Sequence, residues 1–172
     1  MKTLIILAHP NIKNSKINKT LCETIKNMPN VTLHNLYEIY PDSKIDASKE
    51  IELLKSNDKI VFQFPLYWFS SPSILKEWLD VVFSSILYGK EPKMLSGKTF
   101  QIITSMGAPE ERYTPGGRNQ KSIDDILIPF NLSATYMGMN AKSPFGIYDA
   151  MGITDELLSK VAIQYKEIIS NI

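Results

Sequence analysis

Residues 59–83 read KIVFQFPLYWFSSPSILKEWLDVVF, and this stretch decides the fold. The largely apolar run Lys59–Phe64 predicts a strand buried on both faces of a parallel sheet. Pro65 ends that strand, because it has no N–H group to donate to the sheet. The aromatic residues 67–69 follow, and three adjacent aromatics cannot all face one core in a helix or a strand. A loop across the edge of the sheet is therefore expected there.

The segment after this loop has the strongest helical pattern in the chain. Ser71 is expected to cap the helix, with Pro72 at its first position, where proline is favoured. Apolar side chains then recur at helical spacing and form one stripe. They are Ile74, Leu75, Trp78, Leu79, Val82, Phe83 and Ile86. A strand, a loop and a helix in succession form one unit of an alternating α/β fold.

The same alternation extends outward in both directions. Strands are expected at 4–8, 31–36, 59–64 and 99–104, with a fifth inside 138–144, and helices at 17–28, 47–54, 72–86, 122–131 and 154–169. Ser15 and Thr154 are the expected caps of the first and last helices, and Pro129 should limit the fourth near its end. This order predicts an α/β fold, a doubly wound parallel five-stranded sheet with helices on both faces, in a single domain spanning 1–172.

Composition excludes several classes of function. The formal net charge is +1 and the basic residues are scattered, so neither nucleic acid nor direct membrane insertion is expected. One cysteine, Cys22, and two histidines exclude a disulfide framework and a multi-cysteine or histidine-rich metal site. The apolar run near the N-terminus is too short for a signal peptide or a membrane span, which predicts a cytoplasmic protein.

Ligands bind doubly wound sheets beyond the carboxyl ends of the strands, which here means loops 9–15, 65–71 and 105–117. Loop 9–15 leads into a helix N-terminus, where free N–H groups and the helix dipole favour an anion. Ser15 and Asn18 add donors and no acidic residue intervenes. A phosphate site and an ordinary capped helix both fit this pattern, and the G-x-G-x-x-G dinucleotide fingerprint is absent.

The other two loops suit a flat ligand. The aromatics of loop 65–71 fit either the wall of an apolar pocket or a hydrophobic plug against the next helix. Loop 105–117 begins with small residues and Gly107, which let a planar group lie near the backbone. Tyr113 adds a ring and a hydroxyl. An anion site beside two such loops matches the two ends of flavin mononucleotide (FMN).

Four motifs resemble one known family. They are LIILAHPN with a following serine and asparagine, FQFPLYWFSSPSILKEWLDVVF, TSMG followed by EERY, and IPFNLSATYMGM. Over most of its length the chain is similar to the flavodoxin-like NAD(P)H quinone oxidoreductases. These include the DT-diaphorase type and smaller bacterial members, among them ancillary proteins of potassium efflux systems. The resemblance implies a flavodoxin-like fold, a homodimer and a flavin-dependent enzyme.

The resemblance implies hydride transfer from NAD(P)H to flavin N5 and then to a quinone or similar acceptor, in a ping-pong sequence. The short chain favours FMN, with FAD as the alternative. A redox-sensing ancillary subunit that binds a potassium efflux antiporter is the second function considered. A one-electron carrier is the third, and the near-neutral charge argues against it, since such carriers often dock through an acidic face. The sequence identifies neither the physiological acceptor nor the choice of NADH over NADPH.

The same resemblance implies three groups of cofactor-binding residues. His9, Ser15, Lys16, Ile17 and Asn18 would surround the flavin phosphate. The backbone of Pro65, Leu66, Tyr67, Trp68 and Phe69 would pass along one edge of the isoalloxazine ring, and Thr104, Ser105, Met106 and Gly107 would hold its other side.

Tyr113 would be the catalytic residue, close to the reacting face and modulating the rate. The chain departs from the family pattern at two points. No histidine follows Tyr113, unlike in the large members, and Met106 replaces a common glycine, which would narrow the pocket.

Overall fold

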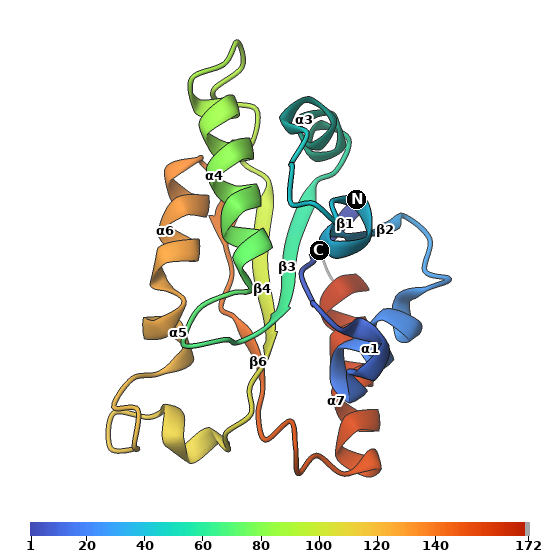
Figure 1. The fold of residues 1–172 in the computed structure, drawn as a ribbon, viewed down its shortest axis with the longest axis vertical. Coiled ribbons are helices and arrows are strands. Elements are labelled where there is room, and N and C mark those ends of the chain that lie inside the picture. Colours follow the sequence, from blue (N-terminus) through green and yellow to red (C-terminus); the bar gives the residue numbers. More distant parts are fainter. Residues whose placement is uncertain (171–172) are drawn as a thin grey trace.

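The computed structural model describes residues 1–170 and has a parallel sheet as its middle layer (Figure 1). The strand order is β2-β1-β3-β4-β5, and β6 also pairs with β4. The strands are β1 (Thr3–Leu7), β2 (Val31–Asn35), β3 (Lys59–Pro65), β4 (Thr99–Ser105), β5 (Asn140–Ala141) and β6 (Phe145–Ile147). Every residue of β1 and β3 is buried, as their continuous runs predict. The doubly wound parallel sheet is confirmed, with β6 in addition to the five expected strands.

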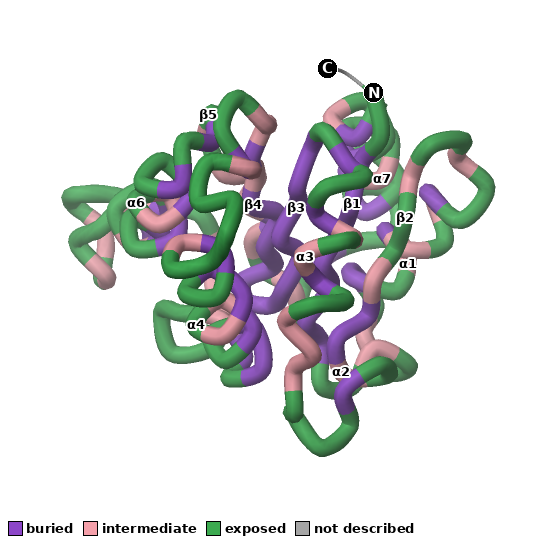
Figure 2. Tube along the Cα trace, turned by 90° about the horizontal axis from the view of Figure 1, so that it is seen from above, coloured by how far each residue is buried: buried purple, intermediate pink, exposed green. Residues whose placement is uncertain are grey.

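Helices cover both faces of the sheet. One face carries α1 (Lys16–Ile25) and α7 (Asp155–Ser170), which pack over Ile5, Val61 and Ile103. The other face carries α3 (Ala47–Lys55), α4 (Ser73–Leu87) and α6 (Ile128–Tyr136). The short elements are η1 (Ile12–Asn14), α2 (Leu36–Ile39), η2 (Glu110–Tyr113) and α5 (Ile123–Ile126). Figure 2 shows the buried residues gathered along β1, β3 and β4, between these helical layers.

Two predicted helix boundaries are wrong. Pro72 is the N-cap of α4 and not its first residue, because its ψ of 145° is extended, and its carbonyl accepts from Leu75 N–H. Ser71 makes no cap: its hydroxyl donates to Pro72 O. The predicted helix 122–131 is two helices, α5 and α6, and Pro129 lies in the first turn of α6, where its missing N–H costs no helix bond.

The segment 138–144 contains the expected fifth strand, β5, and the additional strand β6 follows directly after it. β5 pairs with the first residues of β4, and β6 pairs with its last residues. Pro144 lies between the two strands and cannot donate to β4, which explains the interruption. The Ser15 and Thr154 caps are confirmed, since their hydroxyls accept from Asn18 and Leu157 N–H. Within the described residues, no helix has the length and apolarity that a membrane span requires.

Candidate functional site

The carboxyl ends of β1, β3 and β4 meet at one pocket of about 500 Å³. Its walls come from four segments of the chain that are far apart in sequence. They are His9, Asn11, Asn14, Ser15, Lys16 and Ile17, then Pro65, Leu66 and Tyr67, then Ser105 and Gly107, and last Ala150 and Met151. The three loops expected from the sequence therefore form one site.

One end of this pocket is the N-terminus of α1. The Ser15 hydroxyl accepts from Asn18 N–H at 3.1 Å and so caps the helix. The N–H groups of Lys16 and Ile17 have no backbone or side-chain acceptor among residues 1–170. Two free N–H groups at the positive end of a helix dipole suit an anionic group.

His9 faces this end as a neutral side chain. Its Nδ1 accepts from Asn11 N–H at 3.1 Å, so the ring proton is assigned to Nε2. Burial lowers the pKa of His9 below its usual value, because the charged imidazolium would lose its hydration. His9 therefore offers the pocket a neutral donor.

The ammonium group of Lys16 is held by the start of α7. Lys16 Nζ donates to Ile153 O at 2.9 Å and lies 2.8 Å from the Asp155 carboxylate. The Lys16 side chain lines the pocket, but its charge already has a carboxylate partner. The role expected for Lys16 at a phosphate stays a prediction, and the structure shows that Lys16 joins loop 149–154 to α1.

The aromatic loop after β3 is closed by a tight turn. Tyr67 and Ser70 form an isolated antiparallel bridge, and Trp68 and Phe69 between them have φ values of 49° and 61°. Positive φ at both central residues is the signature of a type I′ turn, which normally contains Asn-Gly. The Trp68 side chain is 95% exposed and Phe69 is 53% exposed. The buried-plug interpretation of this loop is therefore wrong.

This turn also determines which backbone amides are free. Leu66 N–H donates to Ser105 O and Tyr67 N–H donates to Ser70 O, both at 2.8 Å. Pro65 has no N–H group. Of the five residues expected to present their backbone, only Trp68 and Phe69 keep an N–H without an acceptor in the described chain.

The third loop divides between the pocket and the core. Ser105 and Gly107 line the pocket, whereas Thr104 and Met106 point to the opposite face of the sheet and are 0% and 1% exposed. This division follows the alternation of side chains along a strand. Met106 therefore does not narrow the pocket, contrary to the expectation, and its N–H already donates to Ile147 O.

Two predicted residues contribute indirectly or lie elsewhere. Asn18 is buried and does not line the pocket, but its Nδ2 donates to the Ser105 hydroxyl at 2.9 Å. Tyr113 is 8% exposed and packs its ring 5.7 Å from that of Tyr148, outside the pocket lining. Burial raises the pKa of Tyr113, so its hydroxyl stays protonated near neutral pH.

Four pocket residues were not among the predicted site residues. Asn11 ends the LIILAHPN motif and Asn14 belongs to the predicted first loop, but no role was expected for either. Ala150 and Met151 follow β6 and reach the pocket because Ala150 N–H donates to Met106 O at 2.9 Å. Pairings between distant segments, this one together with those of Asp149 N–H with Ala108 O and of Lys16 with Ile153 O, bring the 149–154 loop to the site.

Comparison with known proteins places this geometry in context. The model of a family described as having a flavodoxin-like fold matches residues 1–169. The chain is similar to the uncharacterized NAD(P)H oxidoreductase YdeQ of Bacillus subtilis (strain 168), with 43% identity over 173 residues, covering 100% of this chain and 88% of that protein. It is also similar to the glutathione-regulated potassium-efflux system ancillary protein KefG of Cronobacter sakazakii (strain ATCC BAA-894), with 43% identity over 148 residues, covering 86% of this chain and 80% of that protein.

Among solved structures, the chain is similar to general stress protein 14 of Treponema denticola in complex with FMN. The TM-score is 0.90 with 35% sequence identity, and the match covers 99% of this chain and 98% of that chain.

Proposed function

The chain belongs to this flavodoxin-like family, and on that premise we propose that it is a flavin-dependent oxidoreductase that takes hydride from NAD(P)H and delivers it to a quinone or similar acceptor. The observation that carries the proposal is the junction of the α1 N-terminus and the Tyr67–Ser70 turn in one pocket. Relatives named NAD(P)H oxidoreductase and a relative solved with FMN support it. The match over residues 1–169 supports one flavin-binding domain.

The residues of the pocket fit FMN. The volume of the pocket, about 500 Å³, is typical of small-molecule sites. The free N–H groups of Lys16 and Ile17 suit the phosphate, and the apolar side chains of Pro65, Leu66 and Tyr67 suit the ring. When bound, a flavin would supply the two-electron hydride chemistry. We propose FMN and not FAD, because the pocket's anion-binding end suits a terminal phosphate.

The protein would contribute position and electrostatics to this chemistry. The N–H groups of Trp68 and Phe69 would donate to the edge of the ring and stabilise negative charge that develops there. His9 would donate from Nε2 to the polar part of the cofactor. The exposed ring of Trp68 and the side chain of Met151 would border the space where the nicotinamide and then the acceptor bind.

The direct test is to purify the protein without added cofactor and record its visible spectrum. A flavin spectrum is expected, and the flavin released by denaturation should be FMN. Anaerobic NADH or NADPH should bleach the bound flavin, and a soluble quinone should restore its colour. A colourless protein that binds neither FMN nor FAD would contradict the proposal.

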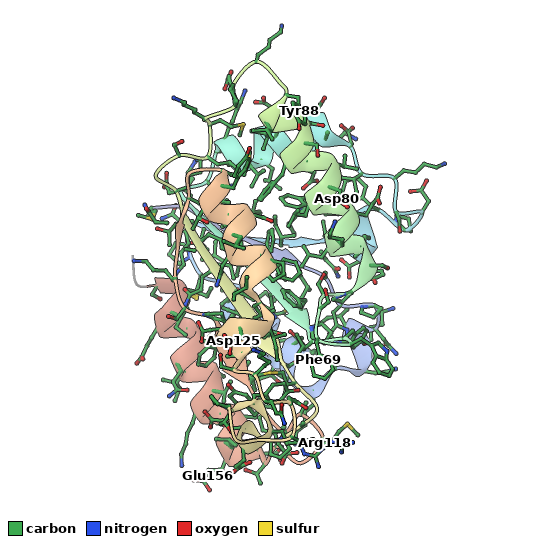
Figure 3. All side chains as sticks on the ribbon, turned by 90° about the vertical axis from the view of Figure 1, so that its left-hand side faces the viewer. Phe69, Asp80, Tyr88, Arg118, Asp125 and Glu156 are labelled. Carbon is green, nitrogen blue, oxygen red and sulfur yellow. The ribbon has the colours of Figure 1, made fainter. Side chains whose placement is uncertain are left out.

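We propose that the active form is a homodimer that buries the face formed by α4 and α6. A groove of about 610 Å³ lies between these helices, and Tyr88, Leu132 and Tyr136 are exposed along it. Figure 3 shows Phe69 near the start of α4, with Asp80 and Tyr88 farther along. A partner on this face would cover apolar surface that a monomer leaves in water. The exposed aromatics of the turn would then lie near the subunit boundary.

The second candidate function is an ancillary subunit of a potassium efflux antiporter. The similarity to KefG favours it. Under this proposal the same flavin site would report redox state to the transporter. Co-purification with an antiporter, and a change in potassium efflux when Trp68 and Phe69 are replaced, would support it. An unchanged efflux rate with and without this protein would contradict it.

A further inference from the structure

A chain of buried hydrogen bonds connects the pocket to the core beneath α7. Tyr165 OH donates to Gln63 Oε1 at 2.7 Å, and Gln63 Nε2 donates to Asn18 Oδ1 at 3.2 Å. Asn18 Nδ2 donates in turn to Ser105 Oγ at 2.9 Å. Tyr165 and Gln63 are completely buried, and only Ser105 borders the pocket. Four side chains from α7, β3, α1 and β4 thus form one continuous path.

The direction of this chain follows from its buried end. Gln63 is the only hydrogen-bond partner of the Tyr165 hydroxyl among residues 1–170. If the side-chain amides of Gln63 and Asn18 were both flipped, the Ser105 hydroxyl would donate to Asn18. The Tyr165 hydroxyl proton would then be buried without an acceptor. An unpaired buried donor is costly, so the arrangement in which Tyr165 donates is favoured. Burial raises the pKa of Tyr165 well above its usual value, which keeps this proton in place.

The direction determines what Ser105 can do in the pocket. Its oxygen accepts from Asn18, and its own proton has no acceptor in the described chain. The backbone of Ser105 is held as well, because its carbonyl accepts from Leu66 N–H. The hydroxyl proton is therefore free to be donated to a group inside the pocket.

We propose that Tyr165 and Gln63 are positioning residues that orient Asn18 and so commit the Ser105 hydroxyl to donate to an oxygen atom of the flavin. This inference rests on the proposed function. The acceptor is a phosphate oxygen or an oxygen of the ribityl chain. Hydrogen bonds in a chain strengthen one another, so a change at Tyr165 should reach the ligand without altering any residue of the pocket lining.

The first test measures dissociation constants for FMN and riboflavin by fluorescence quenching. Ser105→Ala and Tyr165→Phe should each weaken FMN binding by about threefold to tenfold, as expected for one hydrogen bond. The double variant should bind no more weakly than Ser105→Ala, because Tyr165 acts through Ser105. If riboflavin binding falls equally, the acceptor is on the ribityl chain; if only FMN binding falls, it is on the phosphate.

Tyr40→Phe is the matched control. Tyr40 is also a buried tyrosine that donates to a side-chain oxygen, but its partner is Glu50 on the opposite face of the sheet. Loss of the Tyr40 hydroxyl should lower thermal stability and leave the FMN dissociation constant unchanged. Unchanged FMN affinity in Tyr165→Phe or in Ser105→Ala would overturn the proposal.

A second test needs no flavin and therefore separates this inference from the proposed function. In cofactor-free, ¹⁵N-labelled protein, Ser105→Ala removes the acceptor of Asn18 Nδ2, and the side-chain amide signal of Asn18 should shift. Tyr165→Phe should shift the Gln63 and Asn18 side-chain amides together. If the Asn18 side-chain amide signal is the same in wild type, Ser105→Ala and Tyr165→Phe, the chain of hydrogen bonds is not formed. The inference is then wrong, whether or not the protein binds a flavin.

Discussion

Tyr67 and Ser70 exchange two backbone hydrogen bonds, of 2.8 and 2.9 Å, across two aromatic residues in the left-handed region. Non-glycine residues in this region are each strained by about 1 kcal/mol or more. Trp68 regains none of this energy by burial in the described chain, since it is 95% exposed, and Phe69 is only half-buried. Two adjacent aromatic residues that are both strained and exposed are typical of a site that binds a ligand or a partner.

The strain predicts a conflict between stability and function. Replacing Trp68→Asn and Phe69→Gly together gives the preferred type I′ sequence and should raise the free energy of unfolding by about 1–2 kcal/mol. Turnover of NAD(P)H should fall, because the aromatic wall is lost. Urea denaturation and steady-state kinetics measure the two effects.

Ser43→Gly is the control for this prediction. Ser43 also has a positive φ, of 59°, in an exposed turn outside the pocket. Ser43→Gly should raise the free energy of unfolding by at most roughly half as much as the double turn variant does, and it should leave turnover of NAD(P)H unchanged. A destabilised turn variant would show that Trp68 and Phe69 are not strained.

Glu50 is expected to be a main stabilising residue of the fold. Its carboxylate is buried and accepts from His34, Tyr40 and Trp78 at 2.8, 2.5 and 2.6 Å. Burial opposes its ionisation, but these hydrogen bonds outweigh that effect and hold the pKa of Glu50 below its ordinary 4.5. Glu50→Gln should cost about 1–3 kcal/mol of unfolding free energy at pH 7.

This difference should depend on pH in one direction. Because the folded pKa is lowered, the contribution of the carboxylate is complete above pH 4.5 and is lost as the pH falls through the folded pKa. Urea denaturation should show that the difference in unfolding free energy between wild type and Glu50→Gln is smaller below pH 4.5 than at pH 7. The exposed neighbour Glu52→Gln should change stability by less than about 0.5 kcal/mol.

His9 predicts a separate pH effect near neutrality. At pH values between the lowered pKa of the folded protein and 6.5, His9 is mostly protonated in the unfolded chain and mostly neutral in the folded chain. Stability should therefore fall as the pH drops below 6.5, by at most about 1.4 kcal/mol per pH unit. His9→Gln should remove this component. An equal stability difference between the two proteins at pH 7.5 and at pH 5.5 would contradict the assignment.

Tyr113 is expected to affect the rate only modestly. It packs against Tyr148 outside the pocket lining, whereas a general acid must reach the reacting group. Tyr113→Phe should slow flavin reduction in stopped-flow by less than about tenfold, while loss of a general acid typically costs about 10²–10⁴-fold. A larger loss would place the Tyr113 hydroxyl at the reacting face.

The homodimer can be tested by introducing charge on the α4/α6 face. Leu132→Glu should shift the protein to a monomer in analytical ultracentrifugation, because a carboxylate would be buried without a partner. Leu157→Glu is the matched control, since Leu157 is 49% exposed on α7, on the other face of the sheet. A wild-type monomer at high protein concentration would rule the dimer out.

Local patterns explain how much of the fold was predictable. The apolar runs of β1 and β3 mark strands buried on both faces, and the caps at Ser15 and Thr154 use side chains within three residues of their partners. The error at Pro72 is a shift of one residue, because a proline near a helix start fits the cap and the first turn alike. Pro129 was expected near the end of one helix but lies in the first turn of a second helix, and both positions tolerate a proline without an N–H group.

The sequence by itself therefore determined the α/β order, the parallel sheet and the three loops at its carboxyl edge, because periodicity and turn residues act over short distances. Only the tertiary structure decided which residues form the pocket. Lys16 pairs with Asp155, Tyr165 donates to Gln63, and the Ala150 loop reaches the site through Met106. These contacts join residues far apart in the chain, and no local pattern encodes which distant partner a polar side chain will meet once the sheet is assembled.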